Sequence, residues 1–132
     1  MIRVGVVGCG FQGRVHVDSF RTIEGAEVVA VCDRDEQRRD ALADEFGIAG
    51  RHAGHEELLA AGDLDLVTVC TMPDTHRETA LAAFAAGAHV LCEKPFAIDF
   101  AQAREMVEAA RAADRLLSIG FNMRFTDNAQ AL

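Results

Sequence analysis

The sequence contains no tryptophan, no tyrosine and no closely spaced pair among its four cysteines, Cys9, Cys32, Cys70 and Cys92. Structural metal sites usually take their ligands from such pairs, so no metal site is predicted. Each cysteine falls at or near the end of a predicted strand. We interpret all four as small buried hydrophobic residues of a protein in a reducing compartment.

Long apolar segments and clusters of basic residues are missing as well. No hydrophobic run approaches the roughly 18 residues that a membrane-spanning helix needs, and the N-terminus lacks the basic segment and cleavage site of a secretory signal. The formal net charge is −8, whereas nucleic acids and anionic membranes require clustered Lys and Arg. Only Arg34, Arg38 and Arg39 lie close together, beside several acids. We therefore expect a cytoplasmic protein with neither a nucleic-acid nor a membrane partner.

Strand-like and helix-like segments alternate along the 132 residues, a length typical of one domain. Strands are expected at 3–7, 27–32, 64–70, 89–92 and 115–120, with a short and ambiguous third-strand signal at 48–53. Helices are expected at 11–22, 35–46, 55–60, 75–86 and 99–113. This alternation predicts an α/β fold with a doubly wound parallel sheet of about six strands, that is, a Rossmann fold.

The helix expected at 99–113 is the longest and has the clearest pattern. Asp99 and Gln102 have the spacing of a capping box at its start. Its buried stripe is predicted to consist of Phe100, Ala103, Met106, Val107 and Ala110.

The first predicted strand runs directly into Gly8-Cys-Gly10-Phe11-Gln12-Gly13, which fits the pattern GxGxxG. In this pattern the first glycine allows a tight turn, the second lets a phosphate approach the backbone, and the third lets the helix pack on the strand. The strand before the motif and the helix after it favour a dinucleotide pyrophosphate at the helix N-terminus. The alternative is a tight strand–helix turn without a ligand.

Residues that follow the other strands are expected at the same edge of the sheet, where ligands bind in such folds. Asp33 follows the second strand, and its carboxylate can accept hydrogen bonds from an adenosine ribose and repel a 2′-phosphate, which favours NAD over NADP. Arg34 keeps NADP open, because a guanidinium group can bind that phosphate. A solvated loop acid is the alternative for Asp33.

The segment after the fourth strand contains Thr71, Pro73 and His76. Pro73 ends the strand because it fixes φ and lacks a donor, and Asp74 or Thr75 can cap the next helix. His76 then falls in the first turn of that helix. It is either a neutral polar residue that lines a site or a surface residue.

Glu93 and Lys94 follow the fifth strand, and Asn122 and Arg124 follow the sixth. One interpretation is that Glu93 and Lys94 form a surface ion pair that contributes little to stability, and that Asn122 and Arg124 are ordinary loop residues. A lysine at this edge also reaches the cleft where a nicotinamide and a hydroxyl substrate meet. There its ammonium group can polarise a substrate oxygen or help a proton to leave.

In these motifs and their order the sequence resembles the N-terminal domain of the Gfo/Idh/MocA oxidoreductases, which include glucose–fructose oxidoreductase and inositol dehydrogenase. The matching residues are the glycine motif followed by His16, then Asp33, Pro73, His76, Glu93-Lys94-Pro95 and Gly120 to Phe125. The resemblance implies NAD(P)-dependent oxidation or reduction of the CH–OH group of a sugar, cyclitol or related compound. It implies that Lys94 faces the reacting centre and that Pro95 sets the loop beside the nicotinamide, with a cis peptide bond as one form. Asp74 departs from the family, which often has Asn there.

These arguments together define the candidate site, with NAD as the expected cofactor and NADP as the other possibility. The catalytic candidate is Lys94. The cofactor-binding candidates are Gly8, Gly10, Phe11, Gln12, Gly13, Asp33, Arg34, Thr71, Pro73, His76, Glu93, Lys94, Pro95, Asn122 and Arg124.

The resemblance also implies a second α/β domain with a large open sheet, which supplies most of the substrate pocket and the oligomer interface. Residues 1–124 are expected to form the dinucleotide-binding domain, and 125–132 to begin the connection to a substrate domain absent from this sequence. A truncated product, an expression fragment and half of a split enzyme all fit this expectation.

Such a chain should bind cofactor and turn over poorly by itself, so its status as an enzyme stays open. The alternative function is a non-catalytic NAD(P)-sensing or interaction module. A methyltransferase-like domain, which also has an acid after its second strand, fits the motifs less well.

Overall fold

The computed structural model describes residues 1–131, apart from the side chain of residue 128. Its strands are β1 (Ile2–Val7), β2 (Ala26–Cys32), β3 (Gly50–His52), β4 (Leu66–Val69), β5 (His89–Cys92) and β6 (Leu117–Ile119). Its helices are α1 (Phe11–Phe20), α2 (Glu36–Phe46), α3 (His55–Ala60), the 3₁₀ turn η1 (Pro73–Thr75), α4 (His76–Ala85), α5 (Phe100–Ala112), the 3₁₀ turn η2 (Asn122–Phe125) and α6 (Asp127–Gln130).

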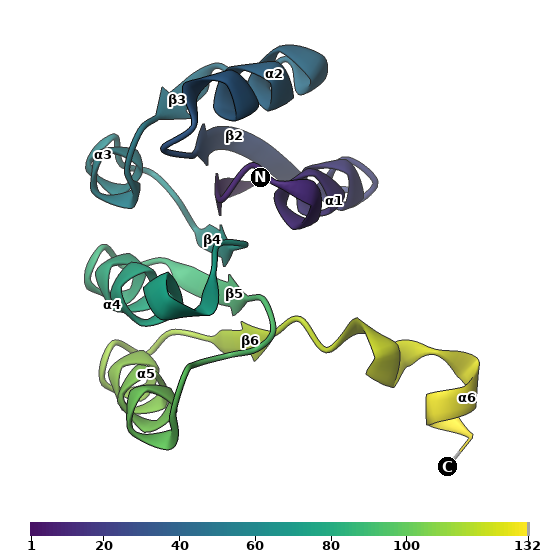
Figure 1. Ribbon diagram of the computed structural model, residues 1–132, viewed down its shortest axis with the longest axis vertical. Helices are drawn as coiled ribbons and strands as arrows, with labels where there is room; N and C mark the ends of the chain where they lie inside the picture. The colour runs from purple at the N-terminus through teal and green to yellow at the C-terminus, as the bar shows by residue number, and fades with distance from the viewer. Residues whose placement is uncertain (132) are drawn as a thin grey trace.

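The strands form one parallel sheet in the order β3-β2-β1-β4-β5-β6. Figure 1 shows α1 and α2 on one face of this sheet and α3, α4 and α5 on the other. The chain starts in the centre, moves outward to β3 and crosses back to place β4 beside β1. The predicted doubly wound fold is therefore confirmed. Ligands bind in such sheets where the strand order switches, which here is between β1 and β4.

Two clusters of buried side chains attach the helices to the sheet. Leu58, Phe84 and Met106 pack from α3, α4 and α5 against one face, and Val17 and Leu42 pack from α1 and α2 against the other. Each is at most 4% exposed, and burying one such side chain contributes roughly 1.5–3 kcal/mol. The central strands are covered on both faces, which explains their nearly unbroken apolar sequences.

The predicted elements are present, although the strands expected at 48–53, 64–70 and 115–120 are shorter than predicted. The helix expected from residue 75 begins earlier, with the 3₁₀ turn at Pro73, and continues as α4 from His76. Proline suits the first position of a helical turn, because its φ is already helical and it has no N–H to satisfy.

The burial pattern of α5 differs from the predicted pattern at the N-terminus of the helix. Met106 and Ala110 are buried as expected, but Phe100 is 82% exposed. Phe100 lies six residues before Met106, so it points roughly a third of a turn away from the buried face. The capping box is only half formed. Asp99 Oδ1 accepts a hydrogen bond from the Gln102 N–H at 2.8 Å, but Gln102 Oε1 has no partner among the described residues.

After β6 the chain leaves the sheet, and η2 and α6 extend away from it (Figure 1). The domain boundary predicted at residue 124 falls within η2. Residue 132, the last of the predicted connection, lies outside the described residues.

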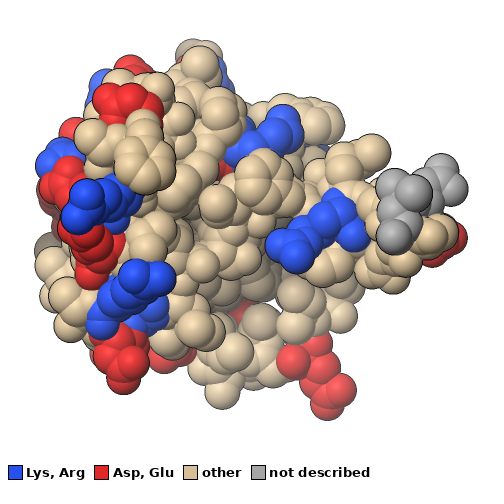
Figure 2. Space-filling view, turned by 90° about the horizontal axis from the view of Figure 1, so that it is seen from below, with Lys and Arg blue, Asp and Glu red and all other residues tan. Residues whose placement is uncertain are grey.

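Charged side chains are interspersed on the face of the molecule that Figure 2 shows. Basic and acidic groups lie next to one another there, with largely uncharged surface between them. Exposed pairs such as Arg77–Glu105 and Arg104–Glu108 occur on the helices, and each contributes little to stability. This face therefore offers no field of a single sign for a polyanion.

Close contact between the glycine motif and its surroundings sets the position of α1. Gly8 has φ +97°, and a Cβ there would lie 2.7 Å from the Cys70 carbonyl oxygen. A Cβ on Gly13 would lie only 1.8 Å from the Gly8 carbonyl oxygen. The first and third glycines therefore fit the motif. A side chain on Gly8 would be strained at this φ and would collide with the backbone after β4, and one on Gly13 would push α1 away from the end of β1.

Replacing Gly13 by Ala should destabilise the fold, because the new methyl group would collide with the Gly8 carbonyl group. We expect a loss of about 3 kcal/mol in the free energy of unfolding, measured by urea titration with far-UV circular dichroism. Gly10→Ala is the matched control, because a Cβ there would meet no atom within 4 Å. Gly10→Ala should unfold like the wild type, and equal stability of the two variants would contradict the described packing.

Candidate functional site

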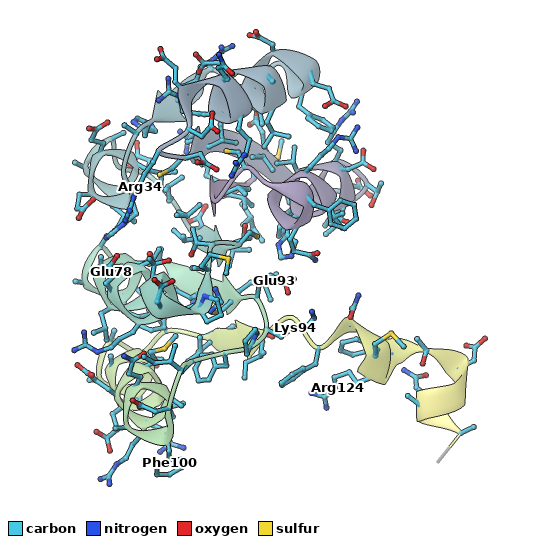
Figure 3. The ribbon with its side chains drawn as sticks, viewed as in Figure 1. Arg34, Glu78, Glu93, Lys94, Phe100 and Arg124 are labelled. Atoms are coloured by element: carbon cyan, nitrogen blue, oxygen red, sulfur yellow. The ribbon has the colours of Figure 1, made fainter. Side chains whose placement is uncertain are left out.

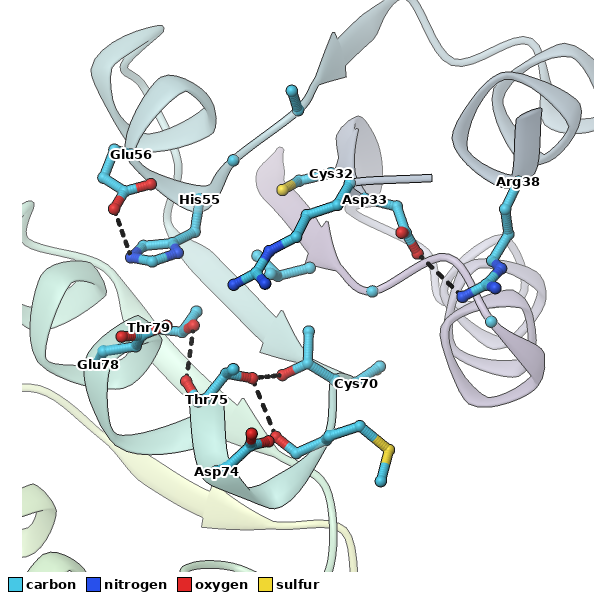
Figure 4. A pocket seen from close by; sticks show the side chains of 18 residues that line it. Cys32, Asp33, Arg38, His55, Glu56, Cys70, Asp74, Thr75, Glu78 and Thr79 are labelled. Atoms are coloured by element: carbon cyan, nitrogen blue, oxygen red, sulfur yellow. Dashed lines mark hydrogen bonds and ion pairs between the residues drawn. The ribbon is translucent and has the colours of Figure 1, made fainter. Parts of the chain in front are cut away.

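A groove of about 660 Å³ opens beside the switch between β1 and β4 (Figure 4). Its volume lies within the range of small-molecule sites. The ends of β1, β2 and β4 and the segments leading into α3 and α4 line it. Its polar lining includes Gly8, Gly10, Asp33, Arg34, Arg38, His55, Glu56, Thr71, Asp74, Thr75 and Glu78.

The N-terminus of α1 borders this groove with backbone donors. Gly10 is the N-cap residue in an extended conformation, and no side chain caps the helix. The first N–H groups of a helix have no partner within the helix, and they attract anions. Open space remains beside Gly10, since a Cβ there would meet no atom within 4 Å. The second glycine of the motif thus leaves room for a phosphate, as its predicted role requires.

Asp33 lies at one end of the groove, where backbone amides hold its carboxylate. Oδ2 accepts a hydrogen bond from the Cys9 N–H at 2.8 Å, and Oδ1 accepts one from the Asp35 N–H at 2.9 Å. The side chain is 13% exposed. A carboxylate oxygen has a second lone pair, so each oxygen can also accept a hydrogen bond from a ligand hydroxyl group.

Two arginines lie at the groove near Asp33, and one of them is close to its carboxylate. Arg38 Nη1 lies 3.7 Å from Asp33 Oδ2, and Arg34 lines the groove directly. Figure 3 shows Arg34 and Glu78 on the side of the sheet that α3 and α4 cover. The groove therefore combines a fixed carboxylate with two guanidinium groups at the end of β2.

Hydroxyl groups order the opposite wall, which is the segment after β4. Thr75 Oγ1 lies 2.7 Å from Thr71 Oγ1 and 2.9 Å from the Met72 carbonyl oxygen. Thr71 lines the groove, as expected, whereas Pro73 sets the turn without lining it. The prediction that Asp74 or Thr75 caps the next helix is wrong, because no side chain caps η1 or α4.

His76 is neither of the alternatives that the sequence left open. Its side chain is fully buried, so it is not a surface residue, and it does not line the groove. Its ring nitrogens lie 2.9 Å from the Thr71 carbonyl oxygen and 3.2 Å from the Phe96 carbonyl oxygen. Each ring nitrogen faces a backbone carbonyl oxygen and no atom of the side chain is exposed, so His76 lies between the segments after β4 and β5 and connects them.

Residues after β5 and β6 form a separate region, outside the groove. Lys94 is exposed, and the Lys94–Pro95 peptide bond is cis, the form that the resemblance allowed. Figure 3 shows Glu93 and Lys94 next to each other at the end of β5. Asn122 and Arg124 are exposed in η2, where the Arg124 guanidinium group lies 5.5 Å from the centre of the Phe125 ring. The groove brings none of these residues together with Asp33.

The glycine motif contributes two further side chains that point away from the groove. Phe11 is 83% exposed. Gln12 Nε2 donates a hydrogen bond to Glu93 Oε1 at 2.9 Å, and His16 Nε2 lies 2.9 Å from the same oxygen. The sequence had matched His16 to the family motif without giving it a role.

The groove residues that the sequence did not identify as site candidates include Arg38, His55, Glu56 and Glu78. His55 and Glu56 begin α3 directly after β3, and their ring and carboxylate lie 3.4 Å apart. The rule that ligands lie beyond strand ends was the available signal. It was not applied at β3, because the strand signal at 48–53 was ambiguous.

The four cysteines lie at the carboxyl edge but are poor nucleophiles. Burial raises the pKa of all four thiols to about 12, so they stay protonated near neutral pH. Cys9, Cys32 and Cys92 are buried, and Cys70 is partly buried. In the part of the chain that the structure describes, no three His, Cys, Asp or Glu side chains are grouped to hold a metal ion. None of the helices described there is long and apolar enough to cross a membrane.

Comparisons with known proteins agree with this geometry. Residues 2–121 match the Gfo/Idh/MocA family, described as an oxidoreductase family with an NAD-binding Rossmann fold. The chain is 39% identical to D-apiose dehydrogenase of Paraburkholderia graminis, over 96% of this chain and 34% of that protein. It is 34% identical to myo-inositol 2-dehydrogenase of Thermotoga maritima, over 99% of this chain and 39% of that protein.

The structural comparison leads to the same family. An oxidoreductase from Agrobacterium radiobacter, solved in complex with NAD⁺, L-tartaric acid and magnesium, superposes with a TM-score of 0.95 at 32% identity. The match covers 98% of this chain and 38% of that one, so the chain spans well under half the length of the proteins that it matches. The matched segment and the described groove together show that the chain belongs to the Gfo/Idh/MocA oxidoreductase family and has its NAD-binding Rossmann fold.

Proposed function

We propose that this chain binds NAD at the carboxyl edge of its sheet as the cofactor half of an oxidoreductase acting on the CH–OH group of a sugar, cyclitol or related compound. One observation carries the proposal: the Asp33 carboxylate lines a groove that the open N-terminus of α1 also borders. A dinucleotide suits both features at once, because its ribose hydroxyl groups are donors and its pyrophosphate is an anion.

The groove is proposed to hold the adenosine half. Gly10 and the first amides of α1 would receive the pyrophosphate, and Asp33 the ribose diol, while Thr71 forms part of the opposite wall. The fixed carboxylate would repel a 2′-phosphate, which favours NAD. Arg34 and Arg38 reduce that repulsion, since both guanidinium groups lie at the groove.

The reacting half is proposed to lie on the side of Lys94. Bound NAD would supply the hydride acceptor there. The exposed ammonium group of Lys94 would polarise the substrate oxygen or help its proton to leave. Pro95, Asn122 and Arg124 would border the same side, where the remaining length seen in the relatives would complete the substrate pocket.

The substrate class follows from the relatives, which are dehydrogenases of D-apiose and of myo-inositol. We propose residues 1–124 as the cofactor domain and 125–132 as the start of the connection to a substrate domain. Any homo-oligomer would then form through that second domain, in a cytoplasmic protein.

Calorimetric titration tests the role of Asp33. We expect the wild type to bind NAD about tenfold more tightly than NADP, because the carboxylate opposes a 2′-phosphate. Asp33→Ala should weaken NAD binding and narrow this preference. Glu108→Gln is the control, because Glu108 is exposed on α5, outside the groove, and should leave the preference unchanged. Tighter binding of NADP by the wild type would refute the Asp33 argument, and binding of neither would refute the proposed function.

Gly10→Ala tests the pyrophosphate position. The variant should fold normally but bind NADH at least about tenfold more weakly, since its methyl group would enter the space beside the helix N-terminus. NADH fluorescence is a clean readout, because the chain has no Trp or Tyr. Unchanged affinity would place the pyrophosphate elsewhere.

Lys94→Ala tests the chemistry once the chain is joined to the substrate domain of a relative. We expect kcat to fall by about 100-fold or more, because a group that moves a proton or polarises the oxygen is lost. Arg111→Ala, an exposed change on α5, should leave kcat unaltered. An unchanged kcat for Lys94→Ala would remove Lys94 from the chemistry. NAD binding without turnover in every joined enzyme would instead favour a sensing module.

A further inference from the structure

Glu93 is the one acidic side chain that is buried among the described residues, at 6% exposure. Its Oε1 accepts a hydrogen bond from Gln12 Nε2 at 2.9 Å and lies 2.9 Å from His16 Nε2. Its Oε2 accepts a hydrogen bond from the Lys94 N–H at 3.1 Å. One carboxylate therefore joins the glycine motif and α1 to the loop after β5.

Gly120 gives this carboxylate its space. A Cβ on Gly120 would lie 2.8 Å from Glu93 Oε1 and 3.2 Å from Glu93 Oε2. The Gly120 N–H donates to the Cys92 carbonyl oxygen at 2.8 Å, which holds the end of β6 against the end of β5. Three motifs that are distant in sequence thus converge on Glu93.

The hydrogen-bonding pattern identifies His16 as a donor. Its Nδ1 is buried and has no partner among the described residues, whereas its Nε2 faces the carboxylate. A neutral imidazole with its proton on Nε2 satisfies the carboxylate and leaves only a lone pair unmatched. A proton on Nδ1 would instead leave a buried donor unsatisfied, which is the costlier arrangement.

Stability alone does not explain this arrangement. Burying a charge costs several kcal/mol before its hydrogen bonds offset the loss, and apolar side chains of similar volume often serve a fold as well. The group that Glu93 holds directly is the backbone of Lys94, and no acidic side chain of the described residues forms an ion pair with the Lys94 ammonium group. The ammonium group is therefore free to act at the edge of the sheet while its backbone is fixed.

We propose that Glu93 is a positioning residue that fixes Lys94 relative to the glycine motif, with Gln12 and His16 as its anchors on α1. The proposal rests on the proposed function and deepens it. Glu93 acts on the nicotinamide half through Lys94, without touching the cofactor, while the adenosine half is held independently at Asp33.

Binding of NADH and of ADP-ribose separates these two halves, because ADP-ribose lacks the nicotinamide ring. Glu93→Gln should weaken NADH binding about tenfold, through lost hydrogen bonds to a charged group, and change ADP-ribose binding less than twofold. The Glu93→Gln/Lys94→Ala double variant should bind NADH no more weakly than Lys94→Ala alone, because Glu93 acts through Lys94. A positional role also predicts that His16→Gln, which keeps a donor near Nε2, binds like the wild type while His16→Leu resembles Glu93→Gln.

Lys94 provides a direct spectroscopic signal, because it is the only lysine in the chain. Labelling with ¹⁵N-lysine gives one backbone amide resonance, from the N–H that donates to Glu93. NADH should shift this resonance more than ADP-ribose does. Glu93→Gln should shift the Lys94 amide resonance in the protein without ligand. Urea unfolding serves as the control that this variant is folded.

The possible results are distinct. Equal losses of NADH and ADP-ribose binding would make Glu93 a purely structural residue and overturn the proposal, as would unchanged binding of both or an unmoved Lys94 resonance. If the wild type binds neither compound, the proposed function itself fails.

Discussion

The close approach of α1 to the end of β1 is the constraint on which the whole site depends. The approach is possible because residue 13 is glycine. A Cβ atom added at Gly13 would lie 1.8 Å from the Gly8 carbonyl oxygen. With α1 at this distance, its first amides face the groove. The Cys9 N–H reaches Asp33, and Gln12 and His16 reach Glu93 on the other side. One packing contact between backbone groups therefore aligns Asp33 on one side of the glycine motif with Glu93 and Lys94 on the other.

Local signals in the sequence were sufficient to predict the fold and to identify several of the residues that line the groove. The alternation of strands and helices, the spacing of Gly8, Gly10 and Gly13, and the position of Asp33 each depend on a few neighbouring residues. The burial of His76 and the pairing of His16 with Glu93 do not, because partners 77 residues apart meet only through the order of the strands. The prediction that Phe100 is buried was wrong for a related reason. Its spacing was compatible with a helix, but the sheet determines which face of α5 is buried.

The two halves of the site differ in how completely this chain builds them. The groove beside Asp33 has a floor and two walls from the described residues. The region around Lys94 is exposed and lies beside the end of β6, from which η2 and α6 extend away from the sheet. Because the matched relatives are more than twice as long, their activities and substrates enter only as proposals for this chain. Family membership, in contrast, rests on residues 2–121 as a whole.

A crystal structure of this chain with NAD⁺ tests the account most directly. The account predicts the pyrophosphate at the N-terminus of α1, the ribose hydroxyl groups hydrogen-bonded to the Asp33 carboxylate and the nicotinamide ring on the Lys94 side, with Glu93 still bound to Gln12 and His16. A dinucleotide bound in the reverse direction, or an adenosine outside the groove with Asp33 unengaged, would contradict it.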